Sequence, residues 1–423
     1  MAAPEKVAIQ FYGSAGKEWT PHMWQGMDFF GWMRLLMRNR FAVHPSCWYI
    51  AFIVTLVSVF HTLLSYVQDL WFGERVRQTK LTEPPLFILG HWRTGTTLLH
   101  ELLILDPRHT YPNTYECLEP NHFLLSEPVL TRLFWFFMPS SRPMDNMASG
   151  WDRPQEDEFA LCMMGQPSPY LTIAFPNHPP QDQDALDLER LSPRAVAKWK
   201  AALLGFMQRI TYRRPGRLIL KSPTHTCRVK TLLEMFPEAR FIHIVRNPYV
   251  VFPSTVNLWQ SLYKTHGIQM AKFAGLEEHV FQTFTRMYEK LEEGRRLVDP
   301  AHFYELRYED LVRDPVGEMR KLYEHLNLDG FEAMKPRLEQ YLARTGDYKT
   351  NQYVVTPERR EEIGRRWGAV IRQYGYEAKE PAPIVAPAAS LPKSRSFTPA
   401  LVPPHLDRWP QVNPDRQSTK ALR

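Results

Sequence analysis

Between Leu81 and about Tyr376, short apolar runs alternate with segments that have a helical hydrophobic period. The clearest runs, in chain order, are "LFILG", "RLILKS", "RFIHIVR" and "HFYELRYED". Each has the length of a buried strand and is followed by a stretch long enough for a covering helix, which is typical of a parallel sheet. The pattern therefore predicts an α/β domain at 81–376, with a mostly parallel central sheet between two layers of helices.

The predicted strands end in polar or charged residues. Lys221, Arg246 and Tyr308 close or directly follow three of them, and Arg93 follows the first strand within a short loop. In open parallel sheets, ligands bind beyond the carboxyl ends of the strands. We therefore expect these four side chains to gather at one edge of the sheet and to carry the chemistry.

A long apolar segment, "CWYIAFIVTLVSVFHTLLSYV" from Cys47 to Val67, lies in a helical N-terminal region at 1–80. It is long enough to span a bilayer and has no formal charge. Polar residues nevertheless recur along it at three- and four-residue steps, namely Thr55, Ser58, Thr62, Ser65 and Asp69. We expect this polar stripe to meet protein or headgroups, with lipid or a hydrophobic partner on the side of Ile50, Ile53, Val57, Phe60 and Leu64.

The segment upstream, "MWQGMDFFGWMRLLMRNRF" from Met23, mixes aromatic residues and methionines with arginines, as a helix in a headgroup layer does. Two interpretations stay open for residues 19–80. The region associates with a membrane, or its two apolar helices pack on each other or on a second subunit. Basic residues flank the apolar segment on both sides, so its orientation in a membrane cannot be read.

Composition narrows the function only slightly. The 423 residues include 52 Lys and Arg against 45 Asp and Glu, a net charge of +7, which suits anionic ligands or membrane surfaces without selecting either. The four cysteines are scattered without a Cys-x-x-Cys pair, which predicts no metal or redox site and indicates a reducing compartment. No secretory signal opens the chain, and the Pro-, Ala- and Ser-rich stretch 377–423 predicts a disordered tail.

The stretch "PLFILGHWRTGTTLLHELL" from Pro85 has the strand, loop and helix layout of a phosphate-binding loop. Gly90 and Gly95 match the template G-x-x-x-x-G-K-[ST], but Thr96 stands where the lysine belongs. Backbone amides and the hydroxyls of Thr96 and Thr97 can still cradle an anion, with Arg93 as the cation. The missing lysine, and the lack of a clear acidic magnesium ligand after a strand, weaken a kinase or ATPase interpretation. A simple Gly-Thr turn is the alternative.

Taken with this loop, "FIHIVRNPYVVFPST" completes a resemblance to sulfotransferases, in particular the tyrosylprotein-type and bacterial enzymes. The pair resembles the phosphosulfate loop and the 3′-phosphate motif of that family, the second carried by Arg246, Asn247 and Ser254. The resemblance extends over 84–376 and implies a P-loop NTPase-like three-layer fold that uses 3′-phosphoadenosine-5′-phosphosulfate (PAPS) as donor. It assigns the donor loop to Arg93, Thr94, Gly95, Thr96 and Thr97.

Further matches to the family are local. "LILKSPTH" resembles its strand ending in a catalytic lysine, which would be Lys221, and "YEDLVRDP" resembles its adenine-contacting segment, which would use Tyr308. "GDYKTNQYVVTPE" loosely resembles a loop that closes over the 3′-phosphate, with contacts from Lys349, Thr350 and Asn351. Tyr308 is equally consistent with a core aromatic, and the last segment with a solvated loop.

The acceptor base has two candidates under this resemblance. Glu116 in "NTYECLEP" resembles the glutamate of the tyrosylprotein enzymes, whereas the histidine of the cytosolic enzymes is displaced here to His225. We predict Glu116, with the nearby Glu119 able to act in the same way. The run Glu156, Asp157 and Glu158 in "WDRPQEDEFALCMM" is expected to begin a helix; otherwise one of its members lines the acceptor pocket.

The sequence thus predicts transfer of a sulfuryl group from PAPS to a hydroxyl or amine, by in-line attack that needs no metal. A P-loop nucleotide kinase, or a membrane-associated module that binds nucleotide without catalysis, is the alternative. The acceptor is a small molecule, lipid, peptide or glycan, not a nucleic acid, and a homo-oligomer stays open. The resemblance places a bacterial enzyme on the cytoplasmic side of a membrane, and a eukaryotic one at the Golgi membrane.

Overall fold

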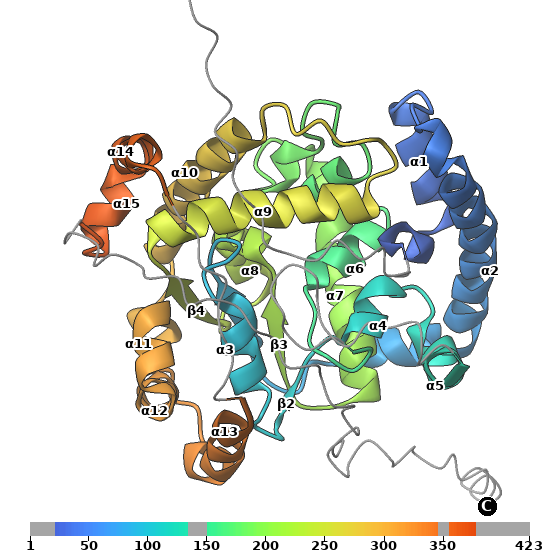
Figure 1. Cartoon of the computed structure of the whole chain (residues 1–423). Helices are drawn as coiled ribbons and strands as arrows, with labels where there is room; N and C mark the ends of the chain where they lie inside the picture. Colours follow the sequence, from blue (N-terminus) through green and yellow to red (C-terminus); the bar gives the residue numbers. More distant parts are fainter. Residues whose placement is uncertain (1–21, 134–149, 346–354, 378–423) are drawn as a thin grey trace, which may run out of the picture. The chain divides into compact units, whose positions relative to one another are not determined.

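The computed structural model describes residues 22–133, 150–345 and 355–377 (Figure 1). Its centre is a five-stranded parallel sheet with the order β2-β3-β1-β4-β5. The strands are β1 (Leu86–Leu89), β2 (His109–Thr110), β3 (Arg217–Lys221), β4 (Arg240–Val245) and β5 (Phe303–Arg307). All four strands predicted from apolar runs are confirmed. The strand β2 was not predicted, because an edge strand of two residues has no periodic pattern.

Helices cover the sheet on both faces. In chain order they are α1 (Phe29–Arg38), α2 (Trp48–Gln78), α3 (Thr96–Leu103), α4 (Thr114–Leu118), α5 (Phe123–Leu133), α6 (Asp157–Met163), α7 (Pro193–Arg213), α8 (Val229–Met235), α9 (Pro248–His266), α10 (Leu276–Arg295), α11 (Tyr308–Arg313), α12 (Pro315–His325), α13 (Phe331–Thr345), α14 (Pro357–Arg366) and α15 (Gly368–Gln373).

Alternation along β1 divides the interior into two cores. Phe87 points into a core shared with α7 to α10, where its ring stacks on that of Phe241 at a centroid distance of 5.6 Å. Ile88 points the opposite way, into a core shared with α3, α12 and α13. Successive side chains of a strand face opposite sides, so a central strand buried on both faces requires a helix layer on each. The predicted three-layer α/β fold is confirmed.

The N-terminal helices α1 and α2 lie side by side, and α2 also packs on α5 and α7 (Figure 1). The polar stripe of α2 faces this packing. Thr55 Oγ1 accepts a hydrogen bond of 2.9 Å from Trp32 Nε1, and Thr62 Oγ1 accepts one of 2.9 Å from the backbone N–H of Phe29. The prediction that the stripe meets protein is confirmed for these residues, whereas Asp69 is exposed.

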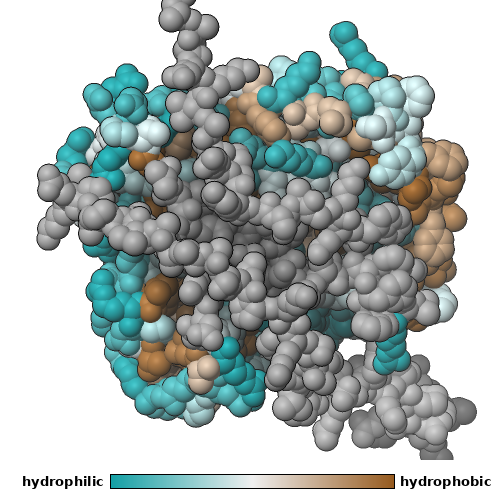
Figure 2. Space-filling model, in the orientation of Figure 1, coloured by the Kyte–Doolittle hydropathy of each residue, from teal (hydrophilic) through white to brown (hydrophobic). Residues whose placement is uncertain are grey.

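The opposite side of α2 is an exposed apolar face. By length and composition alone this helix could cross a membrane. Its exposed large apolar side chains are Trp48, Tyr49, Phe52, Ile53, Leu56, Val59, Phe60, Leu63, Tyr66, Val67, Leu70 and Trp71. Figure 2 shows hydrophobic surface at the edge where α2 lies in Figure 1.

The predicted lipid-facing set of α2 is correct in part. Ile53 and Phe60 are exposed, but Ile50, Val57 and Leu64 are half-buried. The cause is that the line of closest packing runs through Val54, His61 and Gln68, which turns the outward face away from the predicted one. The predicted tail beyond Glu377, like the residues before His22, lies outside the described residues.

Glu305 at the sheet's β5 edge predicts how the fold responds to acid. Burial raises its pKa, but hydrogen bonds from His243 and Tyr374 and the charge of Arg295 outweigh burial and lower the pKa to about 2. A carboxyl with a depressed folded pKa adds stability above its unfolded pKa and loses it as the pH falls toward the folded value.

Glu305→Gln should therefore unfold more easily than the unchanged chain at neutral pH, by on the order of 1–2 kcal/mol. The difference should shrink between about pH 5 and pH 2. Urea unfolding across this range measures it, and Glu339→Gln, on a surface pair with Lys335 at 3.8 Å, is the control that should show little change. A difference that stays constant over the range would refute the assignment.

Candidate active site

The loop after β1 needs glycine at two points. Gly90 has φ 149°, and an added Cβ would lie 2.7 Å from Thr94 Oγ1 and 2.8 Å from the carbonyl of Ile244. Gly95 has φ 103°, and an added Cβ would lie 2.3 Å from the ring of Tyr308. Both backbone conformations disfavour side chains, and both contacts exclude one. Tyr308 therefore packs directly against the loop.

Two hydrogen bonds brace the loop. The N–H of Gly90 donates to Thr226 Oγ1 at 2.8 Å, and Thr94 Oγ1 donates to the carbonyl of His91 at 2.7 Å. Thr96 and Thr97 form the first turn of α3, whose leading N–H groups have no partners within the helix. A helix start that follows such a loop attracts anions. The loop and the start of α3 therefore have the features that suit a phosphate ligand.

Two arginines and a serine meet beside this loop. Arg93 has φ 71° and its Nε donates to Ser254 Oγ at 2.9 Å, from the loop to α9. Arg246, at the end of β4, donates from Nη1 to the carbonyl of Arg93 at 3.1 Å, and its guanidinium lies 4.2 Å from the centre of the Tyr308 ring. The structure thus brings together Arg93, Arg246, Ser254 and Tyr308, residues predicted separately from three parts of the sequence.

Lys221 is the last residue of β3 and places a further positive charge at this edge of the sheet. Its Nζ lies 2.8 Å from Glu156 Oε1, and the Tyr170 hydroxyl donates to Glu156 Oε2 at 2.5 Å. The Lys221 side chain is 1% exposed and that of Glu156 is 15% exposed, so the carboxylate is the more accessible member of the pair. A base and a cation held in contact at the sheet's carboxyl edge can serve proton transfer and charge stabilisation together.

The acidic residues after Gln155 form ion pairs with residues that follow β3, in the same order along the two segments. Asp157 Oδ2 lies 2.6 Å from His225 Nε2, and Glu158 Oε2 lies 2.5 Å from Arg228 Nη1. Burial raises the Asp157 pKa, but His225 outweighs burial and the pKa is lowered. Asp157 and Glu158 lie in the first turn of α6 as expected, yet they are buried partners of the β3 segment.

The predicted bases lie in different surroundings. Glu116 is fully buried, forms a capping box with Asn113, and its Oε2 is 2.7 Å from Arg214 Nη2 while Oε1 is 3.2 Å from Arg213 Nη1. His225 is also fully buried, with Nε2 taken up by Asp157. Glu119 contacts two histidines instead of Lys221. Lys349, Thr350 and Asn351 lie outside the described residues.

Sequence reasoning missed Tyr170 and Thr226, since neither stands in a recognisable motif. The capping box of Glu116 did leave a signal, because "NTYE" has the Asn-x-x-Glu spacing of a helix start. That spacing indicates a structural role for Glu116 which the family resemblance alone does not suggest.

A parallel α/β sheet with a glycine-bearing loop, paired arginines and a lysine–carboxylate pair at its carboxyl edge suits a transferase that acts on an anionic substrate. The chain belongs to the sulfotransferase family, whose model matches residues 84–333. It is 53% identical over 370 residues to the omega-hydroxy-beta-dihydromenaquinone-9 sulfotransferase Stf3 of Mycobacterium bovis and of Mycobacterium tuberculosis, covering 88% of this chain and 95% of each relative. The predicted enzyme class is confirmed, and a nucleotide kinase is not favoured.

Solved structures agree on the fold. Sulfotransferase STF9 from Mycobacterium avium superposes with a TM-score of 0.58 at 20% identity, covering 82% of this chain and 96% of that one. Sulfotransferase STF1 from Mycobacterium tuberculosis H37Rv gives a TM-score of 0.54 at 19% identity, covering 82% and 94%. At these identities the likeness supports the fold alone.

Proposed function

We propose that this sulfotransferase uses PAPS as donor and a membrane lipid with a free hydroxyl as acceptor. The observation that carries the donor is the meeting of Arg93, Arg246 and Ser254 beside the ring of Tyr308. A guanidinium fork and a hydroxyl suit a terminal phosphate, and an aromatic ring at the same edge suits a purine. When bound, PAPS supplies an activated sulfuryl group on its 5′-phosphate.

Around that group, Lys221, Arg93 and the amides of the loop before α3 stabilise negative charge that develops on the leaving phosphate oxygen. Glu156 removes the acceptor proton as the hydroxyl attacks in line. We place Glu156 ahead of Glu116 because Glu156 contacts Lys221 and keeps 15% of its side chain exposed. Glu116 is the second candidate, since two arginines already neutralise its buried carboxylate.

The acceptor class follows from two independent supports. The relative that is 53% identical is named for an omega-hydroxylated dihydromenaquinone, a lipid-like quinone with a hydroxyl. The exposed apolar face of α2 gives this chain a means to reach such a lipid, since a large contiguous apolar patch on a protein surface marks an interaction site. The proposed product is a sulfate ester at the hydroxyl of an apolar lipid.

We further infer that α2 lies in the plane of a membrane surface instead of crossing it. One side of the helix packs on α1, α5 and α7, and its polar stripe is bonded to α1. If α2 crossed the bilayer, the helices packed on it would also have to enter the bilayer. A helix lying in the membrane plane buries only its exposed side in the lipid. We place this surface on the cytoplasmic side, because the named relatives are bacterial and a bacterial enzyme meets the donor nucleotide in the cytoplasm.

Calorimetric titration tests the donor. The desulfated product, 3′,5′-adenosine bisphosphate, should bind more tightly than AMP or ATP, and magnesium should not be required. Transfer is tested by incubating the protein with radiolabelled PAPS and membrane lipid extract, followed by separation of sulfated lipids. Preference for ATP, or label appearing only in water-soluble products, would overturn the donor and the acceptor proposals respectively.

The membrane proposal predicts a charge-sensitive face on α2. The double variant Leu56→Glu, Leu63→Glu should bind anionic lipid vesicles at least about tenfold more weakly, since each Leu loses about 1.5–3 kcal/mol of burial. Leu63 is 59% exposed, and Leu297, after α10, is 58% exposed, so Leu297→Glu is the matched control. Vesicle sedimentation measures both, and equal binding by the two variants would argue against the face.

A further inference from the structure

Three side chains of types that bind metals meet where α2 contacts the segment between α4 and α5. His61 comes from α2, Glu119 follows α4, and His122 precedes α5. The distance to Glu119 Oε2 is 2.9 Å from His61 Nδ1 and 3.0 Å from His122 Nε2. The two imidazole rings are 4.6 Å apart, and the three ligand atoms all lie within 4.8 Å of one another.

The hydrogen bonds of Ser126 determine which nitrogen of His122 carries the proton. Ser126 Oγ donates its hydrogen to the carbonyl of His122 at 3.0 Å and accepts one from the Tyr115 hydroxyl at 2.8 Å. The contact of 2.8 Å between Ser126 Oγ and His122 Nδ1 therefore needs the proton on Nδ1. In the neutral ring, Nε2 then turns its lone pair toward Glu119 Oε2, and either a proton on Nε2 or a metal ion must lie between these two acceptors 3.0 Å apart.

The geometry of the cluster is poor for hydrogen bonds alone. His61 Nδ1, His122 Nε2 and Glu119 Oε2 are buried atoms without a well-directed hydrogen bond in the described part of the chain. A single carboxylate oxygen faces both nitrogens, although buried polar atoms normally find separate partners.

We propose that His61 Nδ1, Glu119 Oε2 and His122 Nε2 bind one Zn²⁺ ion. Two imidazoles and a carboxylate are a common zinc ligand set, with bond lengths of about 2.0–2.2 Å. The hydrogen bond from His122 Nδ1 to Ser126 is the outer contact that orients a metal-bound imidazole. The fourth position is left for water.

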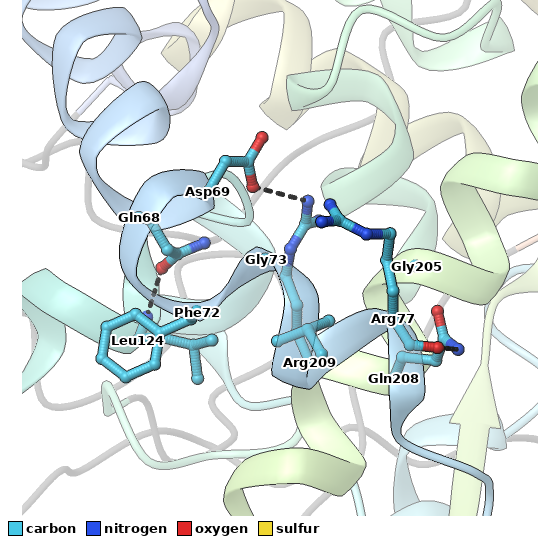
Figure 3. Close-up of a pocket in the computed structure, with 10 residues that line it drawn as sticks. Gln68, Asp69, Phe72, Gly73, Arg77, Leu124, Gly205, Gln208 and Arg209 are labelled. Atoms are coloured by element: carbon cyan, nitrogen blue, oxygen red, sulfur yellow. Dashed lines mark hydrogen bonds and ion pairs between the residues drawn. The ribbon is translucent and has the colours of Figure 1, made fainter.

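Zinc here fastens α2 to the segment between α4 and α5. Gln68, seven residues beyond His61, reinforces the same junction. Its Oε1 accepts a hydrogen bond from the N–H of Leu124 (Figure 3), and its Nε2 donates to the carbonyl of Asn121, both at 2.8 Å. The sequence predicted no metal because it lacks paired cysteines. Glu119 and His122 do have a Glu-x-x-His spacing, but the third ligand, His61, is distant from them in the sequence. The site does not depend on the sulfotransferase chemistry proposed above.

The test uses the full-length protein, stripped with a chelator and titrated with ZnCl₂. We expect one zinc per chain by elemental analysis, with His61→Asn and Glu119→Gln weakening zinc binding at least about 100-fold in calorimetry. The matched control is His243→Asn. It removes a buried histidine whose Nδ1 lies 2.8 Å from Glu305 Oε2, a pair of similar geometry that has no third ligand among the described residues. This control should keep one zinc.

A cobalt titration keeps the proposal testable if a variant fails to fold. The unchanged protein with CoCl₂ should show the intense visible absorption of a four-coordinate ion, abolished by excess zinc, and its melting temperature should rise with either metal. Zinc-edge anomalous scattering from crystals should place the ion between the three residues. Absence of stoichiometric binding, or affinity equal in His61→Asn and the unchanged protein, would mean a hydrogen-bonded cluster only and would overturn the proposal.

Discussion

Replacing Glu156 with glutamine should slow sulfuryl transfer by about 10²–10⁴-fold, the usual contribution of a positioned general base. Glutamine keeps the size of the side chain and can still accept a hydrogen bond from Lys221, but it cannot take up the acceptor proton. The loss should therefore appear in kcat. Binding of 3′,5′-adenosine bisphosphate should change far less, since the contacts of Glu156 are with Lys221 and Tyr170 and the 3′-phosphate is assigned to Arg246.

Glu116→Gln separates the two candidate bases. Glu116 is fully buried between Arg213 and Arg214 and closes a capping box, so its loss leaves two guanidinium groups short of a partner. We expect a lower melting temperature and near-normal kcat per folded molecule. Single-turnover rates, corrected for the folded fraction by circular dichroism, measure both variants. A stable but inactive Glu116→Gln beside an active Glu156→Gln would reverse the assignment.

The fold and the residues at the carboxyl edge of the sheet were predictable because both depend on local patterns. Apolar runs identify strands, and the carboxyl ends of parallel strands lie at one edge, so residues as distant as Arg93 and Arg246 could be expected to meet. Their contact of 3.1 Å, and that of Arg93 with Ser254, realise this expectation. The family resemblance then supplied the chemistry that the spacing alone left open.

The rest depends on pairings between segments, which no local pattern contains. Glu156 meets Lys221 only because the segment before α6 packs on the end of β3, and the same docking pairs Asp157 with His225. Similarly, the outward face of α2 follows from which side packs on α1, α5 and α7, and this rotates it from the face that hydrophobicity predicts. These ion pairs and the outward face of α2 depend on tertiary packing, which the sequence pattern of each helix does not contain.

Arg246→Ala should weaken binding of 3′,5′-adenosine bisphosphate by about 10- to 100-fold while leaving AMP affinity nearly unchanged. A hydrogen bond to a charged group is worth about 1.5–3 kcal/mol, and AMP lacks the 3′-phosphate that we assign to Arg246. Ser254→Ala should show the same selectivity with a smaller loss, because a neutral hydroxyl contributes about 1 kcal/mol.

The chain provides a close control for this prediction. Arg307 ends the neighbouring strand β5 and holds its guanidinium 4.3 Å from the centre of the Tyr376 ring, much as Arg246 sits 4.2 Å from that of Tyr308. Arg307→Ala removes an arginine–tyrosine contact without touching the loop before α3, so both nucleotides should bind as before. Calorimetry with each nucleotide on each variant gives the comparison. If Arg246→Ala lowered the affinity for AMP as much as for the bisphosphate, Arg246 would act on the loop through its bond to the Arg93 carbonyl, and the 3′-phosphate assignment would fail.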